Sequence, residues 1–127
     1  MTNSPTSAAQ PPFRIGHGYD LHRLEHCPPA GHGKPLVVGG VRLDHDRGPI
    51  AHSDGDALLH AVTDALLGAI AQPDIGQLFP NTDPRHESQD SAVFVEEAAR
   101  RVREHGFDIA NLDCTVILEE PKLGPVK

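Results

Sequence analysis

The stretch AHSDGDALLHAVTDALLGAIAQP, residues 51–73, predicts the central helix of the fold. Its large apolar side chains recur at helical spacing and should form one buried stripe: Leu59, Val62, Leu66 and Ile70. Ser53 or Asp54 can cap the N-terminus of this helix, and Asp56 in the first turn suits the helix dipole. Pro73 helps to end the helix. The other elements should therefore pack around one amphipathic helix.

Shorter elements are expected on both sides of this helix. Apolar alternation predicts three strands, over residues 13–24, 36–43 and 112–118. A second helix is predicted over residues 91–105, with Gly106 as its stop and with an apolar face made of Val95, Ala98, Ala99 and Val102. The strand over residues 36–43 contains a Gly pair that suits a bulge or tight bend. Turn-forming residues predict loops over residues 25–35, 44–49 and 74–87.

The order of these elements predicts an α+β fold. We expect a mixed β-sheet with the helices packed on one face, in a single domain over residues 13–127. Residues 1–12 are small, polar and end in proline, and they predict a disordered tail. They lack the apolar run of a signal peptide and the Arg residues of a transit peptide.

Composition and charge exclude several classes of partner. The net charge of −7 argues against binding to nucleic acid, whose phosphates need Lys and Arg. No apolar run is long enough to span a bilayer, so no membrane partner is expected. Cys27 and Cys114 are far apart and form no zinc knuckle or redox motif, which makes a reducing cytoplasm the default location.

The acidic residues are unevenly distributed. Residues 51–83 contain five Asp and no Lys or Arg. Such a segment would repel a phosphorylated ligand unless a cation lies between the two. The sequence therefore raises the question of a metal ion.

Three side chains are candidate ligands for such a metal ion. Asp20 and His22 lie two residues apart in the stretch GHGYDLHRL, so on a strand they point to the same face. His60 lies on the central helix, away from its apolar stripe. Two imidazoles and a carboxylate with a fourth place open form a coordination set of catalytic zinc. Asp56 or Asp64, one turn on either side of His60, could hold the free nitrogen of its ring.

Each of these candidate ligands could also have no role in metal binding. An Asp-x-His pattern is common, and a single helical histidine is often only a half-exposed side chain. The remaining histidines, apart from one before the central helix, show no partner pattern and are interpreted as surface or loop residues: His17, His26, His32, His45, His86 and His105.

Three further stretches could either bind a ligand or have only a structural role. His52 and Ser53 precede a helix N-terminus, where they could contact a phosphate or form a plain capping box. Residues 74–87 are either turns or a ligand loop. Lys122, after Pro121, is either a fixed cation at a strand exit or a solvated lysine.

Five segments, in order over residues 14–125, together resemble the 2-C-methyl-D-erythritol 2,4-cyclodiphosphate synthase family: RIGHGYDLHRL, VVGGVRL, AHSDGDALLHAVTDALLGA, DIGQLFPNTDP and PKLGP. The resemblance implies a phosphorus–oxygen lyase of the non-mevalonate isoprenoid pathway. Such an enzyme converts 4-diphosphocytidyl-2-C-methyl-D-erythritol 2-phosphate to the 2,4-cyclodiphosphate and CMP. The reaction is a metal-assisted intramolecular attack of the 2-phosphate on the β-phosphate.

The resemblance also implies residue roles. Asp20, His22 and His60 match the zinc ligands, and His52 matches a catalytic group that stabilises the transition state. The implied substrate-binding residues are Asp20, Leu21, His22, His52, Ser53, Asp74, Ile75, Gly76, Phe79, Pro80, Asn81, Thr82, Asp83, Leu118, Glu119, Glu120, Pro121, Lys122, Leu123 and Gly124. Among these, residues 74–76 and 79–83 would lie beside the methylerythritol unit, and residues 118–124 would form the cytidine and diphosphate pocket.

Cofactors and assembly follow from the same resemblance. It implies one divalent metal ion per subunit, zinc by its ligands, and a second divalent ion, Mg or Mn. It also implies a homotrimer with its sites between subunits and a cytidine diphosphate-linked small-molecule substrate.

Two departures from the family pattern have consequences. Asn81 replaces the usual Asp of the Phe-Pro-Asp-Thr-Asp loop, which predicts a modest effect on substrate positioning. Family chains continue beyond residue 127 with the carboxylate of the second metal site, so the C-terminal end is expected to be truncated. Two alternatives to the synthase are a truncated, non-catalytic zinc-binding trimer subunit and a zinc hydrolase that uses a metal-bound water.

Overall fold

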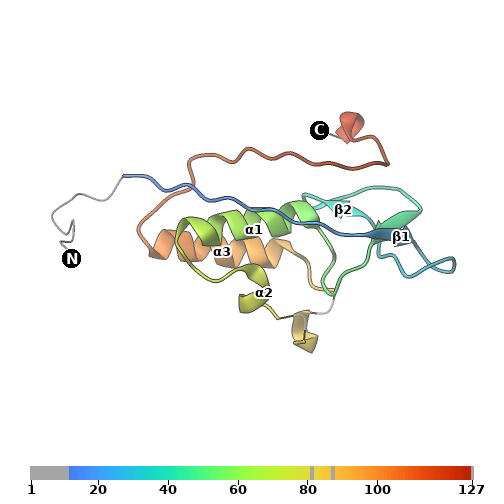
Figure 1. Ribbon diagram of the computed structural model, residues 1–127, viewed down its shortest axis with the longest axis horizontal. Helices are drawn as coiled ribbons and strands as arrows, with labels where there is room; N and C mark the ends of the chain where they lie inside the picture. The colour runs from blue at the N-terminus through green and yellow to red at the C-terminus, as the bar shows by residue number, and fades with distance from the viewer. Residues whose placement is uncertain (1–11, 81, 87, 127) are drawn as a thin grey trace, which may run out of the picture.

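The computed structural model of the protein describes residues 12–80, 82–86 and 88–126, so nearly all of the predicted tail lies outside the described residues. Its elements confirm the α+β class. The helices are α1 (Ala57–Ala69), α2 (Ile75–Leu78) and α3 (Ala92–Glu104), with 3₁₀ turns η1 (Pro84–His86) and η2 (Gly124–Val126). The strands are β1 (Leu24–His26), β2 (Val37–Val38), β3 (Val41–Arg42) and β4 (Arg47–Pro49). In Figure 1, α1 lies between α3 and the extended N-terminal segment.

The core lies where α1 packs on α3. Its buried side chains come from both helices: Val62, Leu66, Leu67, Ile70, Ala98 and Val102. Burial of each large apolar side chain contributes about 1.5–3 kcal/mol. The predicted stripe of α1 is confirmed at Val62, Leu66 and Ile70, but Leu59 is only half-buried and Leu67 takes its place in the core. The buried face of α1 is therefore rotated toward Leu67, because α3 covers that side.

The N-terminus of α1 is capped by Asp56, so the prediction of Ser53 or Asp54 as the cap was wrong. The Asp56 carboxylate is fully buried and accepts the N–H of Leu59 at 3.1 Å. It also accepts the N–H groups of Gly39 and Gly40, at 2.9 and 2.7 Å. A buried carboxylate needs such partners. One side chain thus joins the β2–β3 turn to the start of α1.

The second helix, α3, ends as the sequence predicts. Gly106 follows it with a φ of 84°, a conformation that glycine adopts without a steric penalty. Ala98 and Val102 are buried against α1, while Val95 and Ala99 are half-buried at the edge of the core. Phe94 is also buried.

The strands differ most from the prediction. Instead of one mixed sheet, the described residues form two antiparallel pairs, β1 with β4 and β2 with β3. The predicted strand over residues 36–43 is a hairpin, because Gly39 and Gly40 have φ values of 62° and 80° that suit a two-residue turn. Residues 13–22 are extended but belong to no strand pair within the described chain, and so are residues 112–118 (Figure 1). Alternation specifies two faces, whereas a strand also needs a neighbour for its backbone groups.

Two predicted loops contain regular structure. Residues 44–49 include β4, and residues 74–87 include α2 and η1. Asp74 caps α2 by accepting the N–H of Gln77 at 3.0 Å. Among the described residues, none of the helices is long and apolar enough to cross a bilayer.

Candidate metal centre

The N-terminal segment has a strand-like alternation although it pairs with no strand in the described chain. The inward positions are half-buried: Gly16, Gly18, Asp20 and His22. The outward positions are exposed: Ile15, His17, Tyr19, Leu21 and Arg23. Asp20 and His22 therefore face α1 together, as their spacing predicts.

Two glycines allow this segment to lie directly on the backbone of α1. A Cβ atom at Gly16 would lie 1.7 Å from the carbonyl oxygen of Ala65, and one at Gly18 would lie 1.8 Å from that of Ala61. No side chain fits in that space. The close contact brings the next two inward residues, Asp20 and His22, over the first half of α1, where His60 lies.

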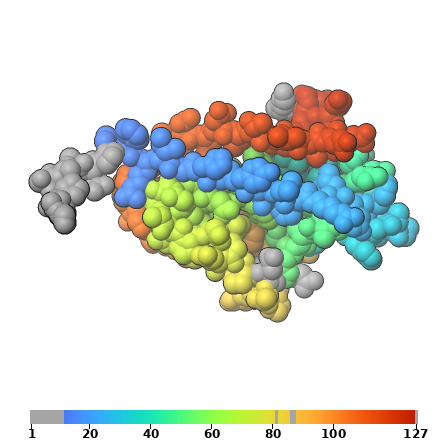
Figure 2. Space-filling view, in the orientation of Figure 1, coloured from blue at the N-terminus to red at the C-terminus, as the bar shows by residue number. Residues whose placement is uncertain are grey.

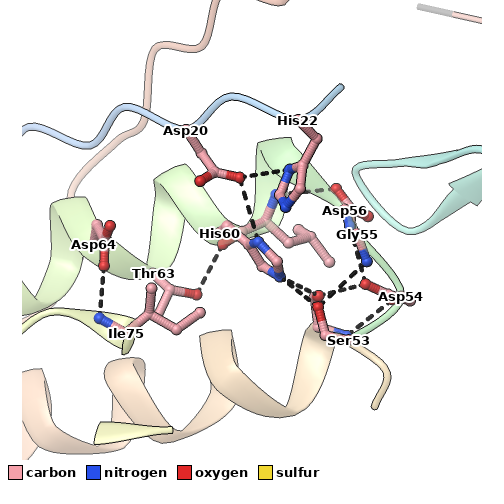
Figure 3. A network of polar contacts seen from close by, with 12 residues as sticks. Asp20, His22, Ser53, Asp54, Gly55, Asp56, His60, Thr63, Asp64 and Ile75 are labelled. Carbon is pink, nitrogen blue, oxygen red and sulfur yellow. Dashed lines mark hydrogen bonds and ion pairs between the residues drawn. The ribbon is translucent and has the colours of Figure 1, made fainter. Parts of the chain in front are cut away.

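Asp20, His22 and His60 converge on one point (Figure 3). Asp20 Oδ2 lies 2.9 Å from His22 Nδ1 and 3.3 Å from His60 Nδ1. One ligand atom from each residue lies within 4.8 Å of the others. The two imidazole centroids are 5.2 Å apart, with the rings tilted by 58°. Three donor atoms at these separations can share one metal ion.

The polar atoms of this cluster are poorly satisfied by the protein. Asp20 Oδ2 and His22 Nδ1 are buried, and neither forms an aligned hydrogen bond with the described residues despite their short separation. Burial raises the pKa of Asp20, but the imidazoles of His22 and His60, when protonated, more than offset this and lower the pKa to about 2. Asp20 is therefore a carboxylate at neutral pH. A buried carboxylate oxygen and a buried imidazole nitrogen that face one another without an aligned hydrogen bond suit a cation between them.

The other nitrogen of His60 is held by two serines. Its Nε2 lies 3.1 Å from Ser53 Oγ and 2.8 Å from Ser91 Oγ. Ser91 donates its single hydroxyl hydrogen to Asp54 Oδ1, and its N–H donates to Asp54 Oδ2 at 3.0 Å. Ser91 Oγ can then only accept a hydrogen bond from His60, which assigns the ring proton to Nε2. The lone pair of Nδ1 is left pointing toward Asp20 and His22, as a metal ligand requires.

Neither carboxylate predicted to hold His60 does so. Asp56 accepts N–H groups of the β2–β3 turn and of α1, and Asp64 accepts the N–H of Ile75 at 2.8 Å. Burial raises the pKa of Asp64, opposed by that hydrogen bond. The prediction failed because one helical turn of separation puts a carboxylate near the helix position of His60 but not near its ring nitrogen.

His52 and Ser53 lie beside this network. Ser53 is buried and contacts the Nε2 side of His60, the ring edge opposite to the metal donors. His52 is half-buried, and its Nε2 lies 3.0 Å from the carbonyl oxygen of Asp83. The loop before α1 thus contacts both the His60 ring and the segment after α2.

A cavity of about 570 Å³ opens beside the donor cluster. Three residues of the predicted metal and substrate set line it, Asp20, Leu21 and His22, together with residues 118–120. Of the other residues in the predicted cytidine pocket, Leu123 lines a separate apolar cavity of about 160 Å³. The structure therefore brings the start of the predicted cytidine pocket next to the donors.

The predicted methylerythritol segment lies at α2 and the turn that follows it. Asp74 and Gly76 are exposed, and Ile75 is half-buried with its N–H bound to Asp64. The ring centroid of Phe79 lies 4.6 Å from that of Phe94. Pro80 and Thr82 are exposed, Asp83 pairs with Arg85 at 2.6 Å, and Asn81 lies outside the described residues.

Comparison with known proteins gives the family of the chain. The model of the YgbB family matches residues 13–127. The chain belongs to the YgbB family. The resemblance stated from the sequence is confirmed by this match together with curated relatives named 2-C-methyl-D-erythritol 2,4-cyclodiphosphate synthase.

Named relatives in this family share more than half of their aligned residues with the chain. The chloroplastic 2-C-methyl-D-erythritol 2,4-cyclodiphosphate synthase of Oryza sativa subsp. japonica is 52% identical over 130 residues, covering 98% of this chain and 56% of the relative. The synthase of Arabidopsis thaliana is 56% identical over 116 residues, which cover 91% of this chain and 48% of the relative. The chain thus spans about half the length of these curated relatives.

A solved structure has the same fold. The bound form with CDP of a 2C-methyl-D-erythritol-2,4-cyclodiphosphate synthase is 44% identical, with a TM-score of 0.70, over 88% of this chain and 71% of that one. The α+β fold described above is therefore a YgbB fold.

Several residues of this candidate site escaped the sequence analysis. Ser91 lies 31 positions from His60 and contacts its ring, and Asp54 binds Ser91 from 37 positions away. A pattern of neighbouring residues does not reveal such contacts. Gly16 and Gly18 did carry a signal, since two glycines spaced by two within a strand pattern indicate a close backbone approach.

The predicted surface histidines are mostly as expected. Exposed ones are His17, His26, His32 and His105. His45 is half-buried in its loop, and the side chain of His86 lies outside the described part of the chain.

Proposed function

We propose that this chain provides the cyclodiphosphate synthase chemistry for which its relatives are named. The substrate would be 4-diphosphocytidyl-2-C-methyl-D-erythritol 2-phosphate, and the products would be the 2,4-cyclodiphosphate and CMP. The observation that carries this proposal is the convergence of Asp20, His22 and His60 in a YgbB chain, with ligand atoms within 4.8 Å of one another.

The donor set fits one divalent metal ion. Two imidazole nitrogens and one carboxylate oxygen, with room for a further ligand, favour zinc. The buried and unsatisfied atoms of Asp20 and His22 support a cation at this point. When bound, such an ion would draw charge from phosphate oxygens and reduce the repulsion between two anionic phosphates. The family resemblance adds a second divalent ion, Mg or Mn, to this proposal.

The remaining site residues would bind and orient the substrate. His52 and Ser53 would contact its phosphates, and His52 would stabilise the transition state. Residues 74–76 and 79–83 would hold the methylerythritol unit, and residues 118–124 the cytidine and diphosphate. The cavity that Asp20 and His22 share with residues 118–120 supports this arrangement, as does the CDP named in the related structure.

The reaction needs positioning rather than a strong base. An oxygen of the 2-phosphate would form a bond to the β-phosphorus, while the bond from that phosphorus to the α–β bridging oxygen breaks. The electron pair would leave with CMP. A phosphate oxygen is already a nucleophile, so holding both phosphates in line would supply most of the catalysis. This accounts for an acidic segment, residues 51–83, without any Lys or Arg of its own.

The proposal extends to assembly and location. We propose one domain over residues 13–127 within a homotrimer whose sites lie between subunits. A cytoplasmic location is proposed from the cysteine pattern and composition, whereas the two plant relatives are named chloroplastic.

A metal analysis combined with turnover tests this function. Zinc content per chain is measured for the wild type and for His60→Ala, and CMP release from the diphosphate substrate is followed in both. We expect about one zinc per wild-type chain, CMP release without net consumption of water, and loss of both in the variant. Equal zinc in the two proteins would contradict the metal centre. Zinc binding without any CMP release would favour the alternative, a non-catalytic zinc-binding subunit.

A further inference from the structure

The ammonium group of Lys34 joins three parts of the chain. Its Nζ donates to the carbonyl oxygen of His52 at 2.8 Å, to that of Ser53 at 2.6 Å and to Ser88 Oγ at 3.2 Å. A lysine ammonium has three N–H donors, so all of them are used. Lys34 itself is half-buried in the connection between β1 and β2. A flexible surface lysine would not form three simultaneous bonds to separate segments.

These bonds fix the backbone of the loop that precedes α1. The carbonyl oxygen of His52 accepts a second hydrogen bond, from the N–H of Ser88 at 2.6 Å. Ser88 has a φ of 55°, a value that a non-glycine residue keeps only where contacts hold it. With two neighbouring carbonyl groups turned toward Lys34, the peptide planes on either side of Ser53 cannot rotate freely. The directions of the His52 and Ser53 side chains are set with them.

Lys34 also supplies the charge that this loop lacks. Residues 51–83 contain five Asp and no Lys or Arg, and Asp54 and Asp56 lie in the loop itself or at the start of the helix. A cation from another segment, bonded to the loop carbonyls, lowers the local negative potential that an incoming phosphate meets.

We propose that Lys34 is a positioning residue for the phosphate-binding loop, acting through the His52 and Ser53 carbonyl groups. This inference rests on the proposed function, in which His52 and Ser53 contact the substrate phosphates. The three donors of Lys34 Nζ all bind protein oxygens, so Lys34 would act on the substrate only through the loop. Loss of Lys34 should therefore weaken binding of the phosphates while leaving the nucleoside pocket unchanged, and the shorter contact of His60 with Ser91 should keep the metal donors in place.

Binding of CDP and of cytidine to the zinc-loaded chain separates these effects. The variants are Lys34→Met, which removes the charge and the donors, and Lys34→Arg, which keeps a charge and several donors. For Lys34→Met we expect the Kd for CDP to rise about tenfold, because the phosphate-binding loop loses both the bonds that fix its backbone and the neighbouring positive charge. The Kd for cytidine and the zinc content should stay at the wild-type values. Lys34→Arg should recover part of the CDP affinity.

Arg103→Met serves as the matched control, because this exposed cation of α3 lies outside the proposed site. It should leave both affinities unchanged. An unchanged CDP affinity in Lys34→Met would overturn the inference. So would an equal loss of CDP and cytidine affinity, or a loss of zinc, since either result indicates a general structural role. A wild-type chain that binds zinc but not CDP would instead contradict the proposed function, and this inference with it.

Discussion

The hydroxyl group of Ser91 carries one hydrogen, which it donates in a hydrogen bond to the carboxylate of Asp54. This detail decides which nitrogen of His60 is available to a metal ion, because Ser91 Oγ can then only accept from Nε2. Ser91 is also the N-cap of α3, but its side chain forms no capping hydrogen bond. Its hydroxyl can therefore be removed without uncapping the helix.

The hydrogen bonds from Asp54 through Ser91 to His60 form a relay, and removing this relay should weaken metal binding. For Ser91→Ala and Asp54→Asn we expect the affinity for zinc to fall about 10- to 100-fold, the range found for the hydrogen-bond partners of metal-bound histidines. In Asp54→Asn the new amide can donate to Ser91, which turns the hydroxyl hydrogen toward His60 and favours the wrong tautomer. Competition with a chromophoric chelator measures the affinity.

Asp113→Asn provides the control for this pair, since Asp113 is exposed and lies outside the relay. It should bind zinc like the wild type. If Ser91→Ala and Asp54→Asn also retain full zinc affinity, the relay does not orient His60.

The metal donors could be predicted from the sequence because two of them follow from strand periodicity. Asp20 and His22 share a face at a spacing of two, and His60 lies on the polar side of a clear amphipathic helix. The partners of His60 could not be predicted in the same way. Ser91 lies 31 residues from His60, and only the packing of α3 on α1 brings them together. A local sequence pattern indicates which face of a strand or helix a side chain occupies, whereas its hydrogen-bond partners depend on tertiary packing.

At the scale of elements, the contact between the N-terminal segment and α1 sets the donor geometry. Gly18→Ala would put a Cβ atom 1.8 Å from the carbonyl oxygen of Ala61, so the segment must move away from the helix. Asp20 and His22 would move with it. We expect at least a tenfold loss of zinc affinity and a lower Tm, measured by chelator competition and by thermal unfolding.

Gly68→Ala is the matched control within α1 itself. A Cβ at Gly68 meets only the carbonyl oxygen of His17, at an ordinary 3.8 Å. Alanine is favoured over glycine inside a helix by about 1 kcal/mol, so this variant should be at least as stable as the wild type and keep its zinc. Loss of zinc in Gly68→Ala, or normal zinc in Gly18→Ala, would contradict the role assigned to the close contact.

The surface of α3 gives a pH dependence that is separate from the metal centre. Hydrogen bonds from Arg100 and then Arg101 lower the pKa of Glu97 from 4.5 to about 2. Because the folded pKa lies below the ordinary value, this carboxylate stabilises the fold above about pH 4.5. The contribution is lost as the pH falls toward 2. The pairs lie at the surface and are screened by solvent, so the effect is small.

Thermal unfolding of Glu97→Gln across pH tests this sign. At pH 7 its Tm should lie below that of the wild type by less than about 4 °C, and the difference should shrink as the pH falls below 4.5. Glu96→Gln changes a neighbouring, exposed carboxylate and should show no such trend. A Tm difference that grows at acidic pH would show that the sign is wrong.

The two long helices, α1 and α3, were predictable and most strands were not, for a physical reason. A helix satisfies its backbone groups within its own segment, so α1 and α3 can be predicted from spacing and end signals. The pattern over residues 112–118 predicts a half-buried strand, yet these residues are extended and mostly exposed in the described chain. Their backbone groups need a neighbouring segment, and the sequence of one strand does not say which.

At the scale of the whole molecule, two extended segments present an apolar face. In Figure 2 the segments of residues 13–23 and 108–120 form blue and orange-red bands along one side, and parts of both line one cavity. Several of their large side chains are strongly exposed: Ile15 at 83%, Tyr19 at 73%, Leu21 at 77% and Ile117 at 95%. The inward face of the same N-terminal segment carries the metal donors. Such an exposed apolar band indicates an interaction surface.

We expect this band to be covered when chains associate in the proposed homotrimer. The double variant Ile15→Asp/Ile117→Asp would put two charges into that contact, where burial of an unpaired charge is costly. Light scattering after size-exclusion chromatography should then give the mass of a smaller species than for the wild type. Val93→Asp, at a side chain of α3 that is 43% exposed, should leave the mass unchanged. A double variant with the wild-type mass would show that the band lies outside the contact, because two buried carboxylates would not be tolerated there.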